Sequence, residues 1–360
     1  MNRKLTYLLF AAILVAILAA PSAAQARAAS DARAEAPTLA GLDPGNLAAL
    51  RTRTAAVAPR RLVETSWSGG TYTATNGESV SVYVSTRYPD SEAVARQWAD
   101  FFAALPHGTE LALLRAYIAP LDEVQRMCWS DDVVGCYGNQ KLVTIGDTSA
   151  GISPTSVATH EYGHHIAANR VNAPWAALTW GTKRWATYAR ICSRVQAGSA
   201  FPGDEGLNYS FNPGEAFAES YRVLVETNGT AVGYDWPIVD PSFLPDAQAL
   251  AAVREDVVTP WTGATTKKIS GKFLRGSRTW STQVATLLDG DLRLRVTAPG
   301  GGGDDVALLS GDGQTVLATG SWDSSGGKSI EYRVCGARSV KVRITRGTTA
   351  ARFTLRVVVP

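Results

Sequence analysis

Two short runs of alternating apolar and polar residues, 71–74 and 80–84, flank the dipeptide Asn76-Gly77. Successive side chains of a strand point to opposite faces of a sheet, and Asn-Gly favours a tight turn. The pattern therefore predicts a β-hairpin with one buried face. Residues 91–105 follow a different period, with apolar positions three and four apart, which is typical of an amphipathic helix.

Further apolar runs predict strands at 111–118 and 141–146. A helix is expected to begin at Ser153-Pro154, because Ser suits a helix cap and Pro suits the first turn, and its apolar flank continues to Val171. The strand at 141–146 leads toward this helix. It is either internal to a sheet or lies at an edge, where its backbone could pair with an extended substrate.

The pattern changes near residue 262. From residue 271 onward, short alternating runs separated by Gly, Asp and Ser turns occur at 292–296, 306–309, 316–318, 340–344 and 353–358. Regularly spaced short strands of this kind are typical of an antiparallel sandwich. The sequence therefore predicts an α+β chain, with a mixed sheet and helices over 62–262 and an all-β sandwich over 263–360.

The first 26 residues have the features of a secretory signal peptide. Basic residues Arg3-Lys4 precede an apolar run at 5–20, and Ala24-Gln25-Ala26 provides a small-x-small cleavage site. The apolar run is shorter than the about 20 residues that span a bilayer. We therefore expect a secreted protein without stable membrane association once the signal is removed. Residues 27–61 lack apolar periodicity and predict a prosegment or flexible linker.

Charge and cysteine content narrow the class of protein. A formal net charge of +3 over 360 residues gives no basis for nucleic-acid binding, and no nucleic-acid-binding motif is present. An exported chain with four cysteines is expected to form disulfides. Cys128 and Cys136 bracket a short loop and are the obvious pair. Cys192 and Cys335 are left either to pair across the two domains or to remain free. The sequence leaves the oligomeric state open.

Candidate chemistry is concentrated in the run HEYGHH at 160–165, which holds three of the four histidines. On a helix, His160 and His164 stand one above the other and suit two imidazole ligands of one zinc ion. Glu161 projects about 100° round the helix, close enough to take a proton from a water on the metal without being a ligand. This His-Glu-x-x-His pattern is typical of zinc-dependent peptide hydrolysis.

A third zinc ligand is required. The pattern that places a third histidine six residues after His164 is excluded, because Arg170 stands there. A second helix beginning at Asn212-Pro213 offers Glu215 and Glu219 on one face. One carboxylate could bind zinc while the other accepts the N–H of a ligand histidine. Alternatively, Glu215 only completes a capping box at the helix start.

These two motifs together resemble the gluzincin group of zinc metallopeptidases, and the Glu-x-Phe-Ala-Glu form of the second resembles the anthrax lethal factor peptidase domain. The resemblance implies a zincin-like fold for 62–262, with His160, His164 and Glu215 as ligands of one zinc ion and Glu161 as general base. It also implies that Glu219 is the partner of a ligand histidine. Tyr209, a few residues before Glu215, is the nearest match to the tyrosine that stabilises the oxyanion in such enzymes.

The expected function is thus that of a secreted zinc metalloendopeptidase acting on a protein or peptide substrate. Two alternatives are a non-catalytic extracellular binding protein with a vestigial metal site, and a zinc amidase acting on cell-wall material. The C-terminal sandwich resembles the pre-peptidase domain of secreted bacterial peptidases. Its segment Gly300–Gly303 with Asp304 and Asp305 offers oxygen ligands that could bind calcium. Outside these motifs, His107 could contribute to the site or simply occupy a surface turn.

Overall fold

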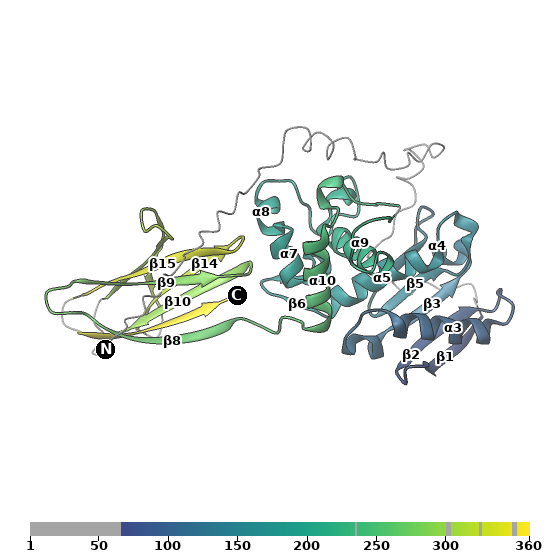
Figure 1. Cartoon of the computed structure of the whole chain (residues 1–360), viewed down its shortest axis with the longest axis horizontal. Helices are drawn as coiled ribbons and strands as arrows, with labels where there is room; N and C mark the ends of the chain where they lie inside the picture. Colours follow the sequence, from purple (N-terminus) through teal and green to yellow (C-terminus); the bar gives the residue numbers. More distant parts are fainter. Residues whose placement is uncertain (1–65, 235, 300–303, 324–325, 348–350) are drawn as a thin grey trace, which may run out of the picture. The chain divides into compact units, whose positions relative to one another are not determined.

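The computed structural model describes residues 66–234, 236–299, 304–323, 326–347 and 351–360. The expected signal peptide at 1–26 and prosegment at 27–61 lie outside these ranges. The described chain is α+β, and it contains two main parts, a mixed sheet with helices followed by β-strands only (Figure 1). No helix among the described residues combines the length and the apolarity needed to cross a membrane.

A five-stranded mixed sheet begins the described part of the chain, with the strand order β1-β2-β3-β5-β4. The predicted hairpin is confirmed, because β1 pairs with β2 in antiparallel fashion around a turn at Gly77, whose φ is 88°. Strands β3 and β5 are parallel to β2, and β4 is antiparallel to β5. The strand bounds are β1 Trp67–Thr73, β2 Ser79–Ser85, β3 Arg115–Ala119, β4 Gly135–Gly138 and β5 Lys141–Ile145.

Two sequence expectations for this sheet need correction. Strand 111–118 begins later than expected, because Thr109–Leu113 forms a 3-10 helix (η1) that buries Leu111 and turns Leu113 to solvent. A 3-10 turn brings residues three apart to one face, so Leu111 and Leu114 both reach the core. Strand β5 lies between β3 and β4. It is therefore internal, and the edge-strand interpretation of 141–146 is wrong.

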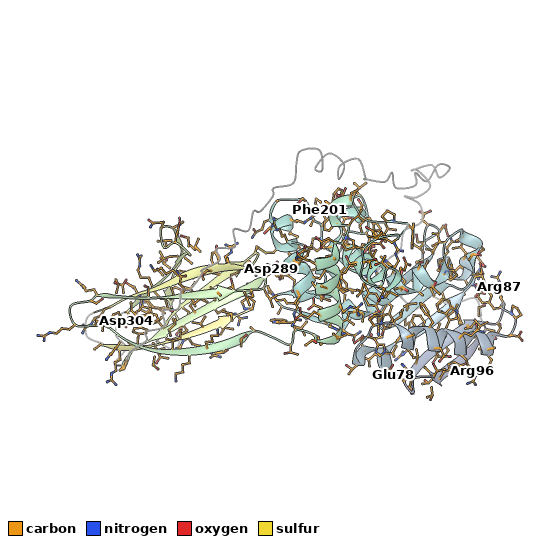
Figure 2. All side chains as sticks on the ribbon, in the orientation of Figure 1. Glu78, Arg87, Arg96, Phe201, Asp289 and Asp304 are labelled. Carbon is orange, nitrogen blue, oxygen red and sulfur yellow. A yellow bond between two sulfur atoms is a disulfide. The ribbon has the colours of Figure 1, made fainter. Side chains whose placement is uncertain are left out.

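Helix α3 (Ser91–Ala104) confirms the predicted helical period, since its buried residues are Ala95, Trp98, Ala99, Phe102 and Ala103. These positions form one stripe that packs on β2, while Arg96 on the opposite side points to solvent (Figure 2).

Helix α4 (Leu121–Cys128) follows β3. The longer helices α5 (Pro154–Ala168), α9 (Pro213–Glu226) and α10 (Ala247–Val258) complete this half, together with the shorter β6 Val171–Asn172, β7 Trp175–Ala176, α6 Ala177–Trp180, α7 Lys183–Tyr188, α8 Ile191–Gln196, η2 Thr148–Ala150, η3 Tyr209–Phe211 and η4 Pro241–Phe243.

Helices α5 and α9 cross in close contact (Figure 1). Every α5 residue from Val157 to Ala167 is buried, because the helix packs on β4 and β5 as well as on α9. The contact depends on Gly163, where an added Cβ atom would lie 2.7 Å from the Cα atom of Ala218 and 3.0 Å from its carbonyl oxygen. A glycine is therefore required at the helix crossing.

Replacing Gly163 with Ala is expected to destabilise the protein by about 1–3 kcal/mol, the usual result of overpacking a core. Ala stabilises a helix by about 1 kcal/mol relative to Gly, but the steric clash at this crossing costs more than that gain. Thermal unfolding monitored by circular dichroism measures the change. Gly70→Ala is the control, because an added Cβ there meets no atom within 4 Å. If the Gly163→Ala protein is as stable as the wild type, helices α5 and α9 can move apart at no cost, and glycine is not required here.

The C-terminal part is a sandwich of two antiparallel sheets, as the sequence predicts. One sheet has the order β13-β14-β10-β16-β8 and the other β12-β11-β15-β9. Their facing residues, such as Leu292, Leu294 and Val342, form a separate hydrophobic core. The bounds are β8 Thr265–Lys272, β9 Thr279–Thr286, β10 Gly290–Thr297, β11 Asp305–Ser310, β12 Val316–Thr319, β13 Ser321–Trp322, β14 Lys328–Val334, β15 Arg338–Thr345 and β16 Arg352–Val359.

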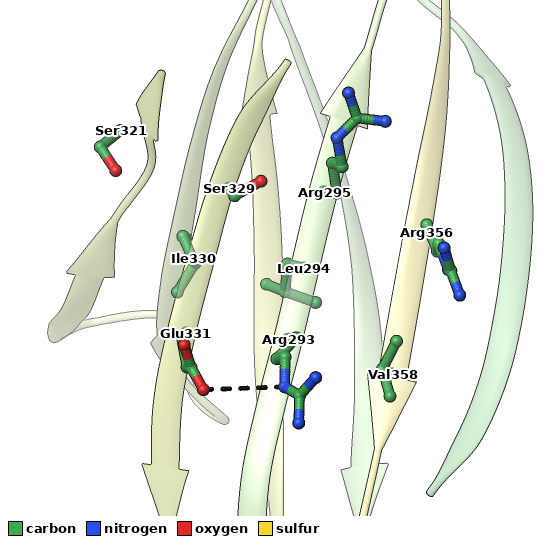
Figure 3. Close-up of a pocket in the computed structure, with 9 residues that line it drawn as sticks. All are labelled: Arg293, Leu294, Arg295, Ser321, Ser329, Ile330, Glu331, Arg356 and Val358. Carbon is green, nitrogen blue, oxygen red and sulfur yellow. Dashed lines mark ion pairs between the residues drawn. The ribbon is translucent and has the colours of Figure 1, made fainter. Parts of the chain in front are cut away.

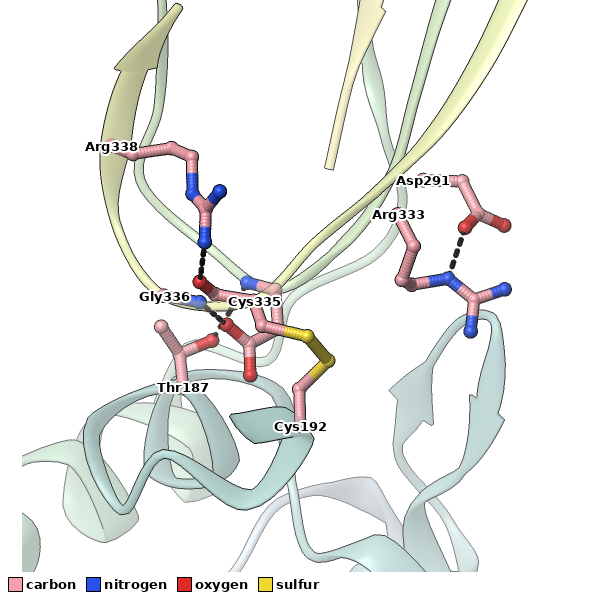
Figure 4. The surroundings of a disulfide bond; sticks show 8 residues. Thr187, Cys192, Asp291, Arg333, Cys335, Gly336 and Arg338 are labelled. Carbon is pink, nitrogen blue, oxygen red and sulfur yellow. Dashed lines mark hydrogen bonds and ion pairs between the residues drawn. A yellow bond between two sulfur atoms is a disulfide. The ribbon is translucent and has the colours of Figure 1, made fainter. Parts of the chain in front are cut away.

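Both disulfides are formed. Cys128 pairs with Cys136 as the sequence predicts. Cys192 of α8 pairs with Cys335, which lies between β14 and β15, so the bond joins the helical part to the sandwich (Figure 4). Beside it, the backbone N–H of Asp289 donates a hydrogen bond of 3.0 Å to Oγ1 of Thr187. Of the two possibilities that the sequence left open for Cys192 and Cys335, the structure shows the paired one.

Removing the second disulfide with Cys192→Ser/Cys335→Ser is expected to cost about 2–5 kcal/mol of stability, because the bond closes a long loop and limits the freedom of the unfolded chain. The two residues are 143 apart, against 8 for Cys128 and Cys136. Chemical denaturation under oxidising conditions measures the loss. Cys128→Ser/Cys136→Ser provides the comparison and should cost less through loop closure. An unchanged midpoint for the Cys192→Ser/Cys335→Ser protein would contradict a structural role for the long-range bond.

Candidate metal centre

His160 and His164, on consecutive turns of α5, converge with Glu215 in the first turn of α9. The two histidine Nε2 atoms are 3.2 Å apart. His160 Nε2 lies 3.3 Å from Oε2 of Glu215, and His164 Nε2 lies 3.4 Å from its Oε1. One donor atom from each residue falls within 4.8 Å of the others, and all three side chains are fully buried. Within the described ranges this is the only group of histidine, cysteine and acidic residues so arranged.

The local sequence explains why Glu215 is held in this position. Asn212 caps α9, with its Oδ1 accepting a hydrogen bond from the N–H of Gly214, and Pro213 occupies the first helical position. The same Asn212 oxygen accepts from the N–H of Gly203, which ties the preceding loop to the helix start. Glu215 directs its carboxylate toward the two imidazoles of α5. The carboxylate is thus presented by a fixed helix end.

Glu219, one turn further along α9, lies behind His160. Its Oε2 is 3.6 Å from Nδ1 of His160, the ring nitrogen that faces away from Glu215. Arg222 holds this carboxylate with two hydrogen bonds, from Nη2 to Oε1 at 2.7 Å and from Nε to Oε2 at 3.0 Å. Burial raises the pKa of Glu219, but the bonds from His160 and Arg222 outweigh it and the net pKa is lowered. Glu219 therefore stays ionised and can orient the His160 ring.

Glu161 lies beside the cluster with its carboxylate fully buried. Neither oxygen has a hydrogen-bond partner among the described residues. Burial raises its pKa well above the usual range, with His160 lowering it and Glu215 and Glu205 raising it further. The space for this side chain depends on Gly135 of β4, where a Cβ atom would lie 3.0 Å from Oε1 of Glu161. An orphaned buried carboxylate at this point is costly unless a ligand or a reaction uses it.

Tyr209 also reaches the cluster, from the short helix η3. Its hydroxyl donates a hydrogen bond of 2.7 Å to Oε2 of Glu215. The side chain is buried. The structure therefore brings together all six residues singled out in the sequence, namely His160, Glu161, His164, Tyr209, Glu215 and Glu219.

The donor set fits a divalent cation. Burial lowers the pKa of His164 and favours the neutral imidazole that a metal requires, although Glu215 opposes this shift. Burial also lowers the pKa of His160, but Glu215 and Glu219 outweigh it and raise the pKa to about 9. Burial raises the pKa of Glu215, yet the two histidines lower it below the usual range. Two imidazoles and a carboxylate are a usual zinc set, and a bound cation would take the place of the His160 proton.

Two residues near the site, Arg222 and Glu205, were given no role from the sequence. Arg222 follows Glu219 by one helical turn, and a basic residue at that spacing on the same face was a signal that could have found it. Glu205 lies in the loop before η3, where its Oε1 accepts a hydrogen bond of 3.3 Å from Asn212, and its charge acts on Glu161. No local pattern marks Glu205, because its approach to α5 depends on the loop's path.

Other candidates lie elsewhere. His107 contacts Oε2 of Glu78 at 2.9 Å and does not join the cluster. In the sandwich, Asp304 accepts a hydrogen bond from the N–H of Gly347, and Asp305 pairs with Lys328, so the two aspartates have separate partners. The remaining part of the expected calcium segment, residues 300–303, lies outside the described residues.

Comparisons with known proteins add little to this geometry. No protein-family model matches the chain, and no characterised protein matches its sequence. Among solved structures, the pre-peptidase C-terminal domain of a collagenase from Bacillus anthracis is similar at 13% identity, with a TM-score of 0.22. The similarity covers 26% of this chain and 86% of that one. A likeness of this size does not support an inference about function.

Proposed function

We propose that this chain is a secreted zinc-dependent metallopeptidase. The observation that carries the proposal is the burial of two imidazoles and one carboxylate from two helices around a common point, with the unpartnered carboxylate of Glu161 beside them. Two disulfides, typical of oxidising compartments, are consistent with export. His160, His164 and Glu215 would hold the ion. Zinc at such a site supplies Lewis-acid polarisation of a carbonyl and lowers the pKa of water to about 7.

Glu161 is the general base. It takes a proton from the attacking water and delivers it to the leaving amine nitrogen, so the same carboxyl group returns to its starting state. Its buried position beside the cluster, without a hydrogen-bond partner in the described part of the chain, leaves the carboxylate free to hold that proton between the two steps. Glu219, fixed by Arg222, orients the His160 ring through Nδ1. The Tyr209 hydroxyl donates to Glu215 at 2.7 Å, and it would have to leave this partner to donate to a developing oxyanion.

Hydrolysis of an unstructured protein such as casein tests the proposal. We expect the purified protein to cleave casein, to lose activity with 1,10-phenanthroline and to regain it with added zinc. The control is 1,7-phenanthroline, an isomer that does not chelate. Purified cell-wall material is assayed in parallel, so that an amidase is recognised by release of wall fragments alone. Casein cleavage that survives chelation, or zinc-loaded protein that cleaves no protein substrate, would contradict the proposal.

A further inference from the structure

The outer face of the sandwich sheet β13-β14-β10-β16-β8 carries a row of positive charges. Arg295 of β10 pairs across the sheet with Arg356 of β16, and Arg356 pairs with Lys268 of β8. Directly paired residues of antiparallel strands point to the same face. Adjacent strands lie about 4.8 Å apart, so three cationic side chains stand side by side in one line.

More cations extend the row along the strands. Arg293 lies two residues from Arg295, and Arg352 and Lys272 are a directly paired couple two rows further along β16 and β8. Residues two apart on a strand share a face. Acidic side chains offset part of this charge. Asp323 pairs with Arg295 at 2.7 Å, and Glu331 approaches Arg293 at 3.7 Å (Figure 3). Among the described residues, Arg356 and Lys268 have no ion-pair partner, and both are exposed.

The opposite outer face of the sandwich differs. On β15, Lys341 and Arg343 point outward, but their cross-strand partners carry no charge: Gln283 and Ser281 on β9, and Leu309 and Ala307 on β11. The chain as a whole has a net charge of only +3. The accumulation of cations is therefore a property of one face and not of a generally basic protein. Like charges directly opposite each other weaken a sheet, so the row is not explained by stability of the fold.

The same face is hollowed. Arg293, Arg295 and Arg356 line an open hollow of about 430 Å³, together with Ser321, Ser329 and one acidic residue, Glu331 (Figure 3). Guanidinium groups bind phosphate and sulfate oxygens through paired N–H donors, and the serine hydroxyls add further donors. None of the side chains that line the hollow is aromatic, so it offers no surface on which nucleic-acid bases could stack.

We propose that this face, defined by Lys268, Lys272, Arg293, Arg295, Arg352 and Arg356, binds a linear polyanion other than a nucleic acid, whose charged groups are phosphates or sulfates. A single small anion would be served by converging donors, whereas these cations are spread over three neighbouring strands and match a repeating charge. Binding at this face would anchor the protein to such a polymer. The proposal is independent of the metal centre, since none of its residues belongs to that site.

The test measures binding of the full chain to fluorescently labelled heparin and to labelled polyphosphate at low and at physiological salt. We expect Lys268→Ala/Arg356→Ala to weaken binding about ten-fold or more and to reduce its salt dependence, because phosphate or sulfate contacts release counterions. The control Lys267→Ala/Arg343→Ala removes the same two types of charge. Lys267 neighbours Lys268 on β8 but points away from the basic face, and Arg343 lies on the other sheet.

Tighter binding to heparin would identify sulfate esters as the preferred group, and tighter binding to polyphosphate would identify phosphate. The proposal is overturned if the wild type binds neither polymer, or if the control variant loses as much affinity as Lys268→Ala/Arg356→Ala. It is also overturned if binding is seen only to phosphatidylglycerol vesicles or only to single-stranded DNA, because the partner would then be a membrane or a nucleic acid.

Discussion

Glu161→Gln is expected to lower kcat for peptide hydrolysis by about 10²–10⁴-fold, the usual contribution of a general base, while leaving the metal bound. Glutamine has nearly the same shape as glutamate but cannot take the proton of the attacking water. Glu161 is not among the three residues whose donor atoms converge, so its loss removes no ligand. Steady-state kinetics on a fluorogenic peptide, with zinc content determined by elemental analysis, measures both quantities.

The control for this variant is Glu78→Gln, which alters a half-exposed glutamate next to His107 and away from the metal centre. Its activity should equal that of the wild type. If Glu161→Gln protein hydrolyses peptides at the wild-type rate, another group is the base and the assignment of Glu161 is wrong. If the Glu161→Gln protein loses zinc as well as activity, Glu161 contributes to metal binding and is not only a base for the water.

Glu215→Ala is expected to abolish stable zinc binding, because two imidazoles alone do not complete a catalytic zinc site. Glu219→Gln, which removes only the charge behind His160, should weaken zinc binding by about 10- to 100-fold, as loss of an outer partner of a ligand does. The loss of zinc affinity should thus be larger for the proposed ligand, Glu215, than for Glu219 behind His160. Competition with a zinc-binding dye gives both dissociation constants, and thermal unfolding of each variant without metal checks that α9 remains folded.

Equal zinc affinity in the wild type and the Glu215→Ala protein would exclude Glu215 as a ligand. A larger loss for Glu219→Gln than for Glu215→Ala would exchange their roles, so that Glu219 binds the ion and Glu215 orients a histidine. The structure favours the first arrangement, because Glu215 approaches Nε2 of both histidines whereas Glu219 approaches only Nδ1 of His160.

The positions of the site residues could be predicted because the information is local. Spacings of four within α5 and within α9 place His160 above His164 and Glu215 above Glu219 on any regular helix. Asn212 and Pro213 also mark the start of α9 in the sequence itself. The contact between helices α5 and α9 is harder to predict from the sequence. The close crossing needs a residue without a side chain at Gly163, and this requirement is recognised only when Ala218 is seen against it.

The parts that sequence could not supply depend on long-range contacts. Cys192 and Cys335 are 143 residues apart, and no periodic pattern encodes which cysteines meet. The apolar residues from Leu111 onward suggested a strand, but Leu111 and Leu113 lie in a 3-10 helix, where one is buried and the other is exposed. The row of Arg295, Arg356 and Lys268 likewise arises from strand register, which joins residues of three separate sequence segments.

Anomalous diffraction at the zinc edge from crystals of the purified protein would locate the ion. We expect a single strong peak between Nε2 of His160, Nε2 of His164 and the carboxylate of Glu215, within about 2.0–2.2 Å of each donor atom. A zinc peak bound by other residues, or no peak at this point in crystals grown with zinc, would contradict this expectation.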